Sequence, residues 1–392
     1  MEKFDELLEQ LQKLLDGSIQ NWLFGAGISV DSNIPLMYPL TERVKTLVMG
    51  EADGVPKKIY TALAGDLPEN SHIEHILSHI GDLIALADRS RDKNAQFAGE
   101  TFSIDQLEQL YRLLISHVGT CIRYGYRAAN AENGVDELVG TAESPIVEIE
   151  QHRRFVRALF GGRANLERRS KISFFTTNYD TLLEDALSME GKASVDGFTG
   201  GAVAYWNPDR EFSQPASGGK SANKVVKLHG SVDWSRDDSQ KLLRNRYGVK
   251  YLSDPAQILI YPQATKYVET QKDPFATLFA EFRSALKYHE DNVLCVCGYS
   301  FGDNHINEEI QAALKDPANR TTLIAFVREG GQGLASPLSD WLGEREVSAK
   351  IFVATNRGLY NGSQDRHEPS GGELSWWTFQ GMTEFLENGA VL

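Results

Sequence analysis

Residues 171–180, KISFFTTNYD, hold an apolar run that is followed at once by polar side chains. The run 172–175 predicts a buried strand, and leucines at helical spacing from Leu182 onward predict a helix directly after it. Open α/β sheets bind ligands outside the carboxyl ends of their strands, so this pattern places Asn178 and Asp180 where they would touch a ligand. The alternative is that Asn178 only turns the chain and Asp180 only caps the helix.

A glycine-containing turn follows the first predicted strand. The apolar run 19–24 leads directly into Gly25-Ala26-Gly27-Ile28-Ser29. Two glycines let a backbone turn tightly and approach a phosphate without interference from a Cβ atom. The third glycine of the dinucleotide fingerprint is absent, because position 30 is valine. The loop is therefore either a nucleotide-binding turn or a plain tight turn.

Two later strands end in the same way. The run 224–228 is followed by His229, and the run 293–297 is followed by GYSFGD at 298–303. A lone histidine at a strand end is more often structural than catalytic, although the glycine beside it suggests close approach of a ligand. Asp303 stands before a predicted helix, where it would either cap that helix or bond a ribose hydroxyl.

Strands that alternate with helices predict an α/β fold, here a Rossmann-like parallel sheet of about six strands with a large all-helical insertion. Residues 1–18 form an N-terminal helix, and residues 19–40 and 165–392 form the sheet domain. Residues 41–164 are the insertion, because helical periodicity dominates there and strand-like alternation is scarce.

The composition argues against nucleic-acid, zinc and membrane contacts. The net charge of −14 argues against a broad, salt-driven grip on nucleic acid, although basic residues gather locally in 153–171. Three cysteines cannot build a disulfide framework or a four-cysteine zinc site. The first segment is acidic and amphipathic, unlike a signal peptide, and no apolar run reaches membrane-spanning length. We therefore expect a cytoplasmic protein without a membrane contact.

Taken in order, the motifs GAGIS, TTNYD, HGS and GYSFGD resemble the sirtuin family. The resemblance is closest to its prokaryotic branch of antiviral NAD-consuming effectors, and within that branch to the sirtuin-like partner of HerA-type ATPases. It covers residues 19–40 and 170–355 and reaches the helical insert only by position. The family implies a Rossmann-like domain that takes NAD as substrate, a homo-oligomer and a possible HerA-type ATPase partner.

Site roles follow from the resemblance by match of position. It implies that Asn178 and His229 are catalytic, with His229 as the base. Asn178 would also help Asp180 to hold the nicotinamide ribose and amide. The implied NAD-binding residues are Gly25, Ala26, Gly27, Ser29, Thr177, Asp180, Gly298, Ser300 and Asp303. Among these, the first four would cradle the diphosphate and nearby ribose, and Gly298 and Ser300 would line the adenosine side.

Two departures from the deacylating sirtuins bear on the activity. Those enzymes carry a four-cysteine zinc module, and they follow Ile-Pro with Asp-Phe-Arg where this chain has Leu36-Met37-Tyr38. Both departures disfavour protein deacylation and leave NAD binding untouched. We therefore expect a metal-independent NAD glycohydrolase that gives nicotinamide and ADP-ribose, acting as an NAD-depleting antiviral effector. The alternatives are an NAD-dependent deacylase or ADP-ribosyltransferase, and a non-catalytic NAD or ADP-ribose sensor.

Overall fold

A computed structural model provides the structure of the chain. It describes residues 2–17, 19–130, 134–161, 172–213, 222–237, 239–246, 259–260, 273–287 and 291–389. Most of the local group of basic residues lies outside these ranges, at Arg163, Arg168, Arg169 and Lys171.

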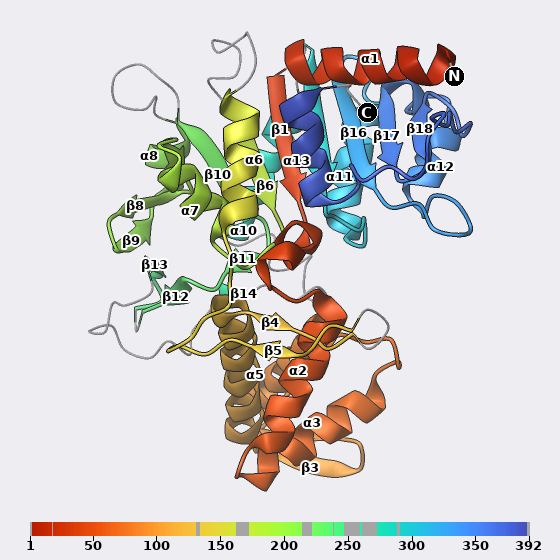
Figure 1. Ribbon diagram of the computed structural model, residues 1–392. Coiled ribbons are helices and arrows are strands. Elements are labelled where there is room, and N and C mark those ends of the chain that lie inside the picture. The colour runs from red at the N-terminus through yellow and green to blue at the C-terminus, as the bar shows by residue number, and fades with distance from the viewer. Residues whose placement is uncertain are drawn as a thin grey trace.

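The fold is built on one eight-stranded sheet (Figure 1). In spatial order its strands are β18 (Gly358–Asn361), β17 (Ile351–Thr355), β16 (Thr321–Val327), β15 (Asn292–Cys297), β1 (Ile19–Phe24), β6 (Ser173–Thr176), β10 (Asn223–Lys227) and β7 (Ser194–Val195). Neighbouring strands run parallel except for the antiparallel pair β17 and β18. The predicted α/β fold is confirmed: the predicted runs 19–24, 172–175, 224–228 and 293–297 lie in the sheet as β1, β6, β10 and β15, and β7 and β18 form its two edges.

The strand order reverses at β1. From β1 the chain builds outward through β6 and β10 on one side, and β15, β16 and β17 follow on the other side. Phe24 at the end of β1 pairs with Cys297 of β15 and with Thr176 of β6, and Thr176 pairs with Lys227 of β10. The four turns that the sequence singled out therefore leave the sheet at one edge. Such a reversal is the place where open α/β sheets bind ligands.

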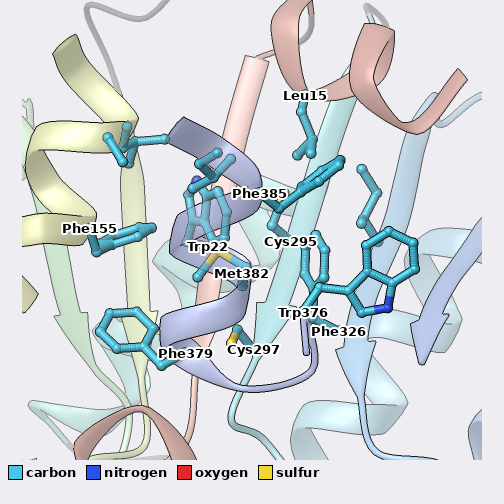
Figure 2. Packing of buried hydrophobic residues seen from close by; sticks show 14 of the residues in the cluster. Leu15, Trp22, Phe155, Cys295, Cys297, Phe326, Trp376, Phe379, Met382 and Phe385 are labelled. Carbon is cyan, nitrogen blue, oxygen red and sulfur yellow. The ribbon is translucent and has the colours of Figure 1, made fainter. Parts of the chain in front are cut away.

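Helices cover both faces of the sheet because its central strands are apolar on both sides. One face is covered by α1 (Glu2–Gly17), α6 (Glu150–Gly161), α7 (Leu182–Met189) and α13 (Phe379–Asn388). Figure 2 shows the aromatic centre of this layer, where Trp22 of β1 lies near Phe155 of α6, with ring centroids 5.3 Å apart. The opposite face is covered by α10 (Phe275–Leu286), α11 (Asn304–Lys315) and α12 (Leu338–Gly343).

A second hydrophobic core lies among the helices between β1 and β6 in the sequence. It is formed chiefly by α2 (Met37–Gly50), α3 (Gly54–Asp66), α4 (Ile73–Arg89) and α5 (Ile104–Tyr124), which gather beyond one end of the sheet (Figure 1). Two short hairpins accompany them, β2 (Asn94–Phe97) with β3 (Glu100–Ser103), and β4 (Tyr126–Arg127) with β5 (Leu138–Val139). The segment is therefore mostly helical and not all-helical.

The last helix of that segment, α6, belongs with the sheet. Its amphipathic stripe packs on the face of β1, and its neighbours are α13 and α7. The range predicted for the insertion, 41–164, thus includes one helix whose apolar face is buried against the sheet. Periodicity alone shows that a face is apolar and leaves its partner undetermined.

A small antiparallel sheet flanks the β10 side. The spatial order of its strands is β12 (Trp234–Arg236), β13 (Leu242–Asn245), β9 (Val203–Trp206) and β8 (Phe198–Gly200). The helix α8 (Pro208–Ser213) follows β9 in the chain. The two-residue strands β11 (Gly230–Ser231) and β14 (Leu259–Ile260) pair beside it. Two short 3-10 helices, η1 (Ala26–Ser32) and η4 (Ser348–Lys350), complete the described elements that bear on the site or its surroundings.

Candidate functional site

The turns after β1 and β15 contact each other backbone to backbone. The Gly27 N–H donates to the Gly298 carbonyl at 2.9 Å, and the Gly25 N–H donates to the Cys297 carbonyl at 3.2 Å. A Cβ atom on Gly25 would lie 2.6 Å from the Gly298 oxygen, and one on Gly298 would lie 2.6 Å from the Ile28 nitrogen. Gly298 also has a φ of +66°, which favours glycine. These glycines therefore have a packing role, and two of their N–H groups already donate within the protein.

Ser29, Asn178 and Asp180 form one hydrogen-bonded group. The Ser29 hydroxyl donates to Asp180 Oδ2 at 2.9 Å and accepts from Asn178 Nδ2 at 3.0 Å. Asp180 Oδ1 accepts the Leu182 N–H at 3.1 Å, at the beginning of α7. All three side chains are buried. Asp180 thus binds the first residue of α7, although the N-cap residue of that helix is Thr181, and it also joins the turn after β6 to η1.

In this group, Asn178 has a buried polar atom that lacks a hydrogen-bond partner among the described residues. Its side chain is 7% exposed, and its Oδ1 atom has no hydrogen-bond partner among the described residues. A buried acceptor without a partner is rare, and its desolvation costs about 1–3 kcal/mol. The backbone N–H of Asn178 donates to Thr176 Oγ1 at 3.0 Å, and the side-chain amide is oriented by Nδ2, which donates to Ser29. The free position of the site is therefore an acceptor that suits a hydroxyl or water donor.

His229 and Asp303 form a second buried pair. His229 Nε2 lies 2.8 Å from Asp303 Oδ2, and Asp303 Oδ1 accepts the His305 N–H at 3.0 Å as the N-cap of α11. An ionised carboxylate can only accept, so Nε2–H is the donor of this hydrogen bond. The predicted helix cap at Asp303 is confirmed. Its second oxygen binds histidine, so both carboxylate oxygens have partners within the protein.

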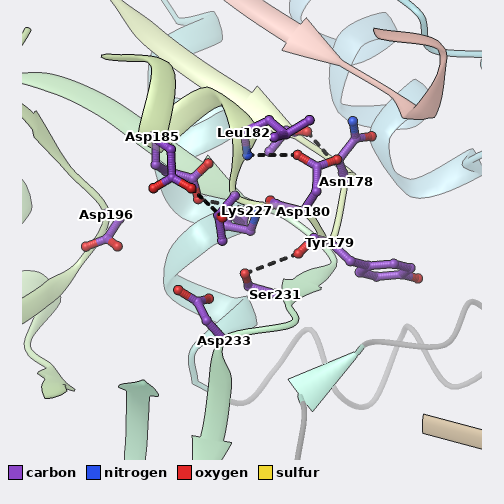
Figure 3. A network of polar contacts seen from close by, with 12 residues as sticks. Asn178, Tyr179, Asp180, Leu182, Asp185, Asp196, Lys227, Ser231 and Asp233 are labelled. Atoms are coloured by element: carbon purple, nitrogen blue, oxygen red, sulfur yellow. Dashed lines mark hydrogen bonds and ion pairs between the residues drawn. The ribbon is translucent and has the colours of Figure 1, made fainter. Parts of the chain in front are cut away.

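Hydrogen bonds join the turn that carries Asn178 to the turn that carries His229. The Tyr179 carbonyl accepts from Ser231 Oγ at 3.3 Å and from the Val232 N–H at 3.0 Å. The next carbonyl, that of Asp180, accepts from the ammonium of Lys227. Figure 3 shows Tyr179, Lys227 and Ser231 beside Asp180 in the turn after β6. Asn178 and His229, the two candidate catalytic residues, therefore lie on two turns that hydrogen bonds hold together.

The other predicted site residues lie around these groups. Ala26 and Thr177 are partly buried, and the Thr177 N–H donates to the Phe24 carbonyl at 3.0 Å, joining the ends of β6 and β1. Ser300 is exposed on the loop after β15. The roles of the predicted residues toward NAD stay predictions. What the structure brings together is Ser29 with Asn178 and Asp180, and His229 with Asp303.

Several buried polar residues near the site were not predicted. Lys227 and Glu184 form an ion pair at 3.4 Å, and burial raises the pKa of Glu184 to about 7 although the charge of Lys227 opposes it. The Tyr179 hydroxyl donates to Glu74 of α4, so the β6 turn also contacts the helical core. A lysine at the end of an apolar strand, as in KVVKL, was the sequence signal for the first of these contacts.

His152 of α6 lies beneath η1. Its Nδ1 is 3.3 Å from Ser32 Oγ, and its Nε2 is buried without a partner among the described residues. Burial lowers the pKa of His152 to about 4, an effect that the negative charge of Asp180 opposes. The ring is therefore neutral at physiological pH and acts as part of the core, packed near Phe379 at 5.0 Å between ring centroids.

The residues that the structure describes contain no group of three or more His, Cys, Asp or Glu side chains placed to hold a metal ion. The three cysteines are free and buried. Within the described part of the chain, the helices are too short or too polar to cross a bilayer.

Part of the chain matches a known protein family. Residues 172–347 match the family described as the SIR2-like domain. The chain is also similar to a crystal structure described as that of a Sir2 homolog–NAD complex, with 14% identity, 81% of each chain covered and a TM-score of 0.34. No curated protein matches the chain. The family match, which spans the turns after β6, β10 and β15, supports the sirtuin-like resemblance there.

Proposed function

We propose that this protein binds NAD at the carboxyl edge of its sheet and hydrolyses it to nicotinamide and ADP-ribose. The observation that carries the proposal is the buried Oδ1 of Asn178, which has no hydrogen-bond partner among the described residues and lies on a turn that is hydrogen-bonded to the segment after His229. The SIR2-like match over residues 172–347 supports NAD as the substrate.

Asn178 suits one partner of the reaction, a hydroxyl group. A ribose hydroxyl or the attacking water could donate to Oδ1 and satisfy the buried acceptor. The opposite end of the amide already donates to Ser29, which fixes the orientation of the side chain. An amide held in this way positions its ligand with little loss of entropy on binding.

The chemistry requires few groups from the protein. The bond from ribose C1′ to the nicotinamide nitrogen breaks, and its electron pair neutralises the cationic ring, so no strong general acid is needed. The ribose develops oxocarbenium character, as in glycoside hydrolysis. The water oxygen bonds to C1′ and releases one proton, which the imidazole of His229 accepts. Asp303 then stabilises the imidazolium through Nε2, from which its oxygen lies 2.8 Å away.

The test is incubation of purified protein with NAD, with and without an acetylated peptide, followed by chromatography of the products. We expect nicotinamide and ADP-ribose in equal amounts and no dependence on the peptide. Nicotinamide that forms only when peptide is present would show acyl-group removal or transfer. Binding of NAD without any product would show a sensor.

His229→Ala tests the assigned base. Removal of a positioned base lowers the rate on the order of 10²–10⁴-fold. His79→Ala is the matched control, because His79 also pairs with an aspartate, Asp66, at 2.9 Å but lies on α4 in the helical part. Equal turnover in the His229 and His79 variants would contradict the assignment.

We also propose, from the resemblance alone, that the protein is an NAD-depleting antiviral effector that forms a homo-oligomer with a HerA-type ATPase as a possible partner. Co-purification of the two proteins and light scattering test the assembly. A strictly monomeric protein that is fully active alone would count against it.

A further inference from the structure

Lys227 is buried beneath the turn that carries the candidate site. It is the last residue of β10, and it is 1% exposed. Its ammonium donates to the Asp180 carbonyl and lies 3.4 Å from Glu184 Oε1 on α7. The charged end of this side chain thus bridges the end of a strand, a loop carbonyl and the first turns of the following helix.

Its position follows from strand alternation. Side chains of a strand point alternately to the two faces of the sheet, so Lys227 shares a face with Val225, which packs in the core beneath α6 and α7. An ammonium on that face must find anionic or carbonyl partners, because a buried charge without them is very unfavourable. Glu184 and the Asp180 carbonyl supply both kinds.

We propose that Lys227 is a positioning residue that fixes the β6 turn, and with it the side chains of Asn178 and Asp180, for NAD cleavage. The proposal rests on the proposed function for its kinetic part. Its structural part concerns the turn itself and can be tested without substrate.

The hydrogen bonds of the neighbouring carbonyl explain why the bond between Lys227 and the Asp180 carbonyl matters. The carbonyl of Tyr179 is held by Ser231 and Val232, so two successive carbonyls of the turn accept from β10 and the residues that follow it. With both carbonyls held, the peptide planes that flank Asp180 are fixed. The Asp180 side chain can then reach Ser29, and Ser29 in turn orients the Asn178 amide.

Three variants and one control separate this role from a general effect on folding. Lys227→Met removes the ammonium with nearly the same length of side chain. Lys227→Met combined with Glu184→Gln also removes the carboxylate that would otherwise be buried alone. Glu184→Gln by itself keeps the ammonium on the Asp180 carbonyl. Lys224→Met is the control, because Lys224 lies on the same strand and pairs with Glu281 of α10 at 2.6 Å, on the opposite face of the sheet.

The first measurement is hydrogen exchange of the turn 177–182 in the protein without ligand. We expect both Lys227 variants to exchange about tenfold or more faster in this turn, because local opening there becomes easier. Glu184→Gln and Lys224→Met should leave the exchange of the turn within about threefold of the natural protein. Unchanged exchange in both Lys227 variants would overturn the proposal, whether or not the protein cleaves NAD.

The second measurement is the turnover of NAD together with the affinity for ADP-ribose by calorimetry. We expect both Lys227 variants to lose on the order of 10²-fold in kcat, as misplaced catalytic groups do, and to bind ADP-ribose at full stoichiometry. A loss of kcat that merely matches a loss of binding stoichiometry would show partial unfolding and overturn the proposal. A loss of kcat without faster exchange of the turn would also overturn it, since Lys227 would then act directly on the substrate.

Absence of NAD cleavage in the natural protein would defeat the proposed function alone. The exchange experiment would still decide whether Lys227 holds the turn.

Discussion

Replacing Asn178 with alanine separates its role toward a ligand from its role in the fold. The substitution removes the hydrogen bond from Nδ2 to Ser29, worth about 1 kcal/mol. It also removes the unpartnered Oδ1, whose burial costs about 1–3 kcal/mol. These terms oppose each other, so the free energy of unfolding should change by no more than about 1–2 kcal/mol.

Ser29→Ala provides the contrasting variant in the same group. It leaves Asp180 Oδ2 without its hydroxyl donor and Asn178 Nδ2 without its acceptor. Two buried groups that lose a partner cost about 2–4 kcal/mol together. Ser29→Ala should therefore lower the free energy of unfolding more than Asn178→Ala does, although serine is the smaller side chain.

The assay is a melting curve and an NAD turnover measurement on each purified variant. An unfolding entropy of about 2 cal/mol/K per residue over a chain of this length means that about 1 kcal/mol shifts Tm by roughly 1 °C. We expect Asn178→Ala to melt within about 2 °C of the natural protein and to lose on the order of 10²–10³-fold in turnover. Ser29→Ala should melt about 2–5 °C lower. Near-normal turnover in Asn178→Ala, or a loss of stability as large as that of Ser29→Ala, would refute the reasoning.

Gly298→Ala should destabilise the protein by about 2–5 kcal/mol, because its φ of +66° is left-handed and the new Cβ would clash with Ile28. Gly81→Ala on α4 is the control, because its Cβ would meet nothing within 4 Å. Equal melting temperatures of the two variants would contradict the close packing of the turns after β1 and β15. The buried His152 has its pKa lowered to about 4 from 6.5, so its contribution to stability is complete above pH 6.5 and is lost as the pH falls toward 4. That loss amounts to about 3 kcal/mol, so urea titrations at pH 7 and pH 4 should show the natural protein losing about 3 kcal/mol relative to His152→Leu; an unchanged difference would contradict the prediction. Chelator should leave NAD cleavage unchanged, and a loss of all activity that zinc restores would show that the expected absence of a metal is wrong.

The strands and their turns could be predicted because their signal is local. Each apolar run that ends in glycine or polar residues, such as 172–175 before Thr176, carries the strand and its end in consecutive residues. Strands β1, β6, β10 and β15 could be located in this way. The edge strands β7 and β18 could not be located, because strands of two and four residues are too short for a clear hydrophobic pattern. The hairpins β2–β3 and β4–β5 were missed for the same reason.

The partners of the polar residues could not be predicted from those signals. The glycines of GAGIS are compatible with a nucleotide-binding turn or a plain tight turn, and the structure shows that Gly25 and Gly27 are required by the close approach of Gly298, more than 270 residues away. His229 and Asp303 were both predicted as site residues, but not as a pair. Their distance of 2.8 Å depends on the two loops meeting above β1 and β6.

The sequence by itself determined which residues stand at strand ends, because alternation, helical spacing and turn residues act over a few positions. It thereby placed Asn178, Asp180 and His229 at one edge of a parallel sheet. Only the tertiary structure decided which of them touch. The order of the strands set Ser29 against Asp180, Asp303 against His229, and Lys227 beneath the β6 turn. Each of these contacts joins segments that are distant in the chain, so it depends on long-range strand pairing and close packing, which no local pattern of residues encodes.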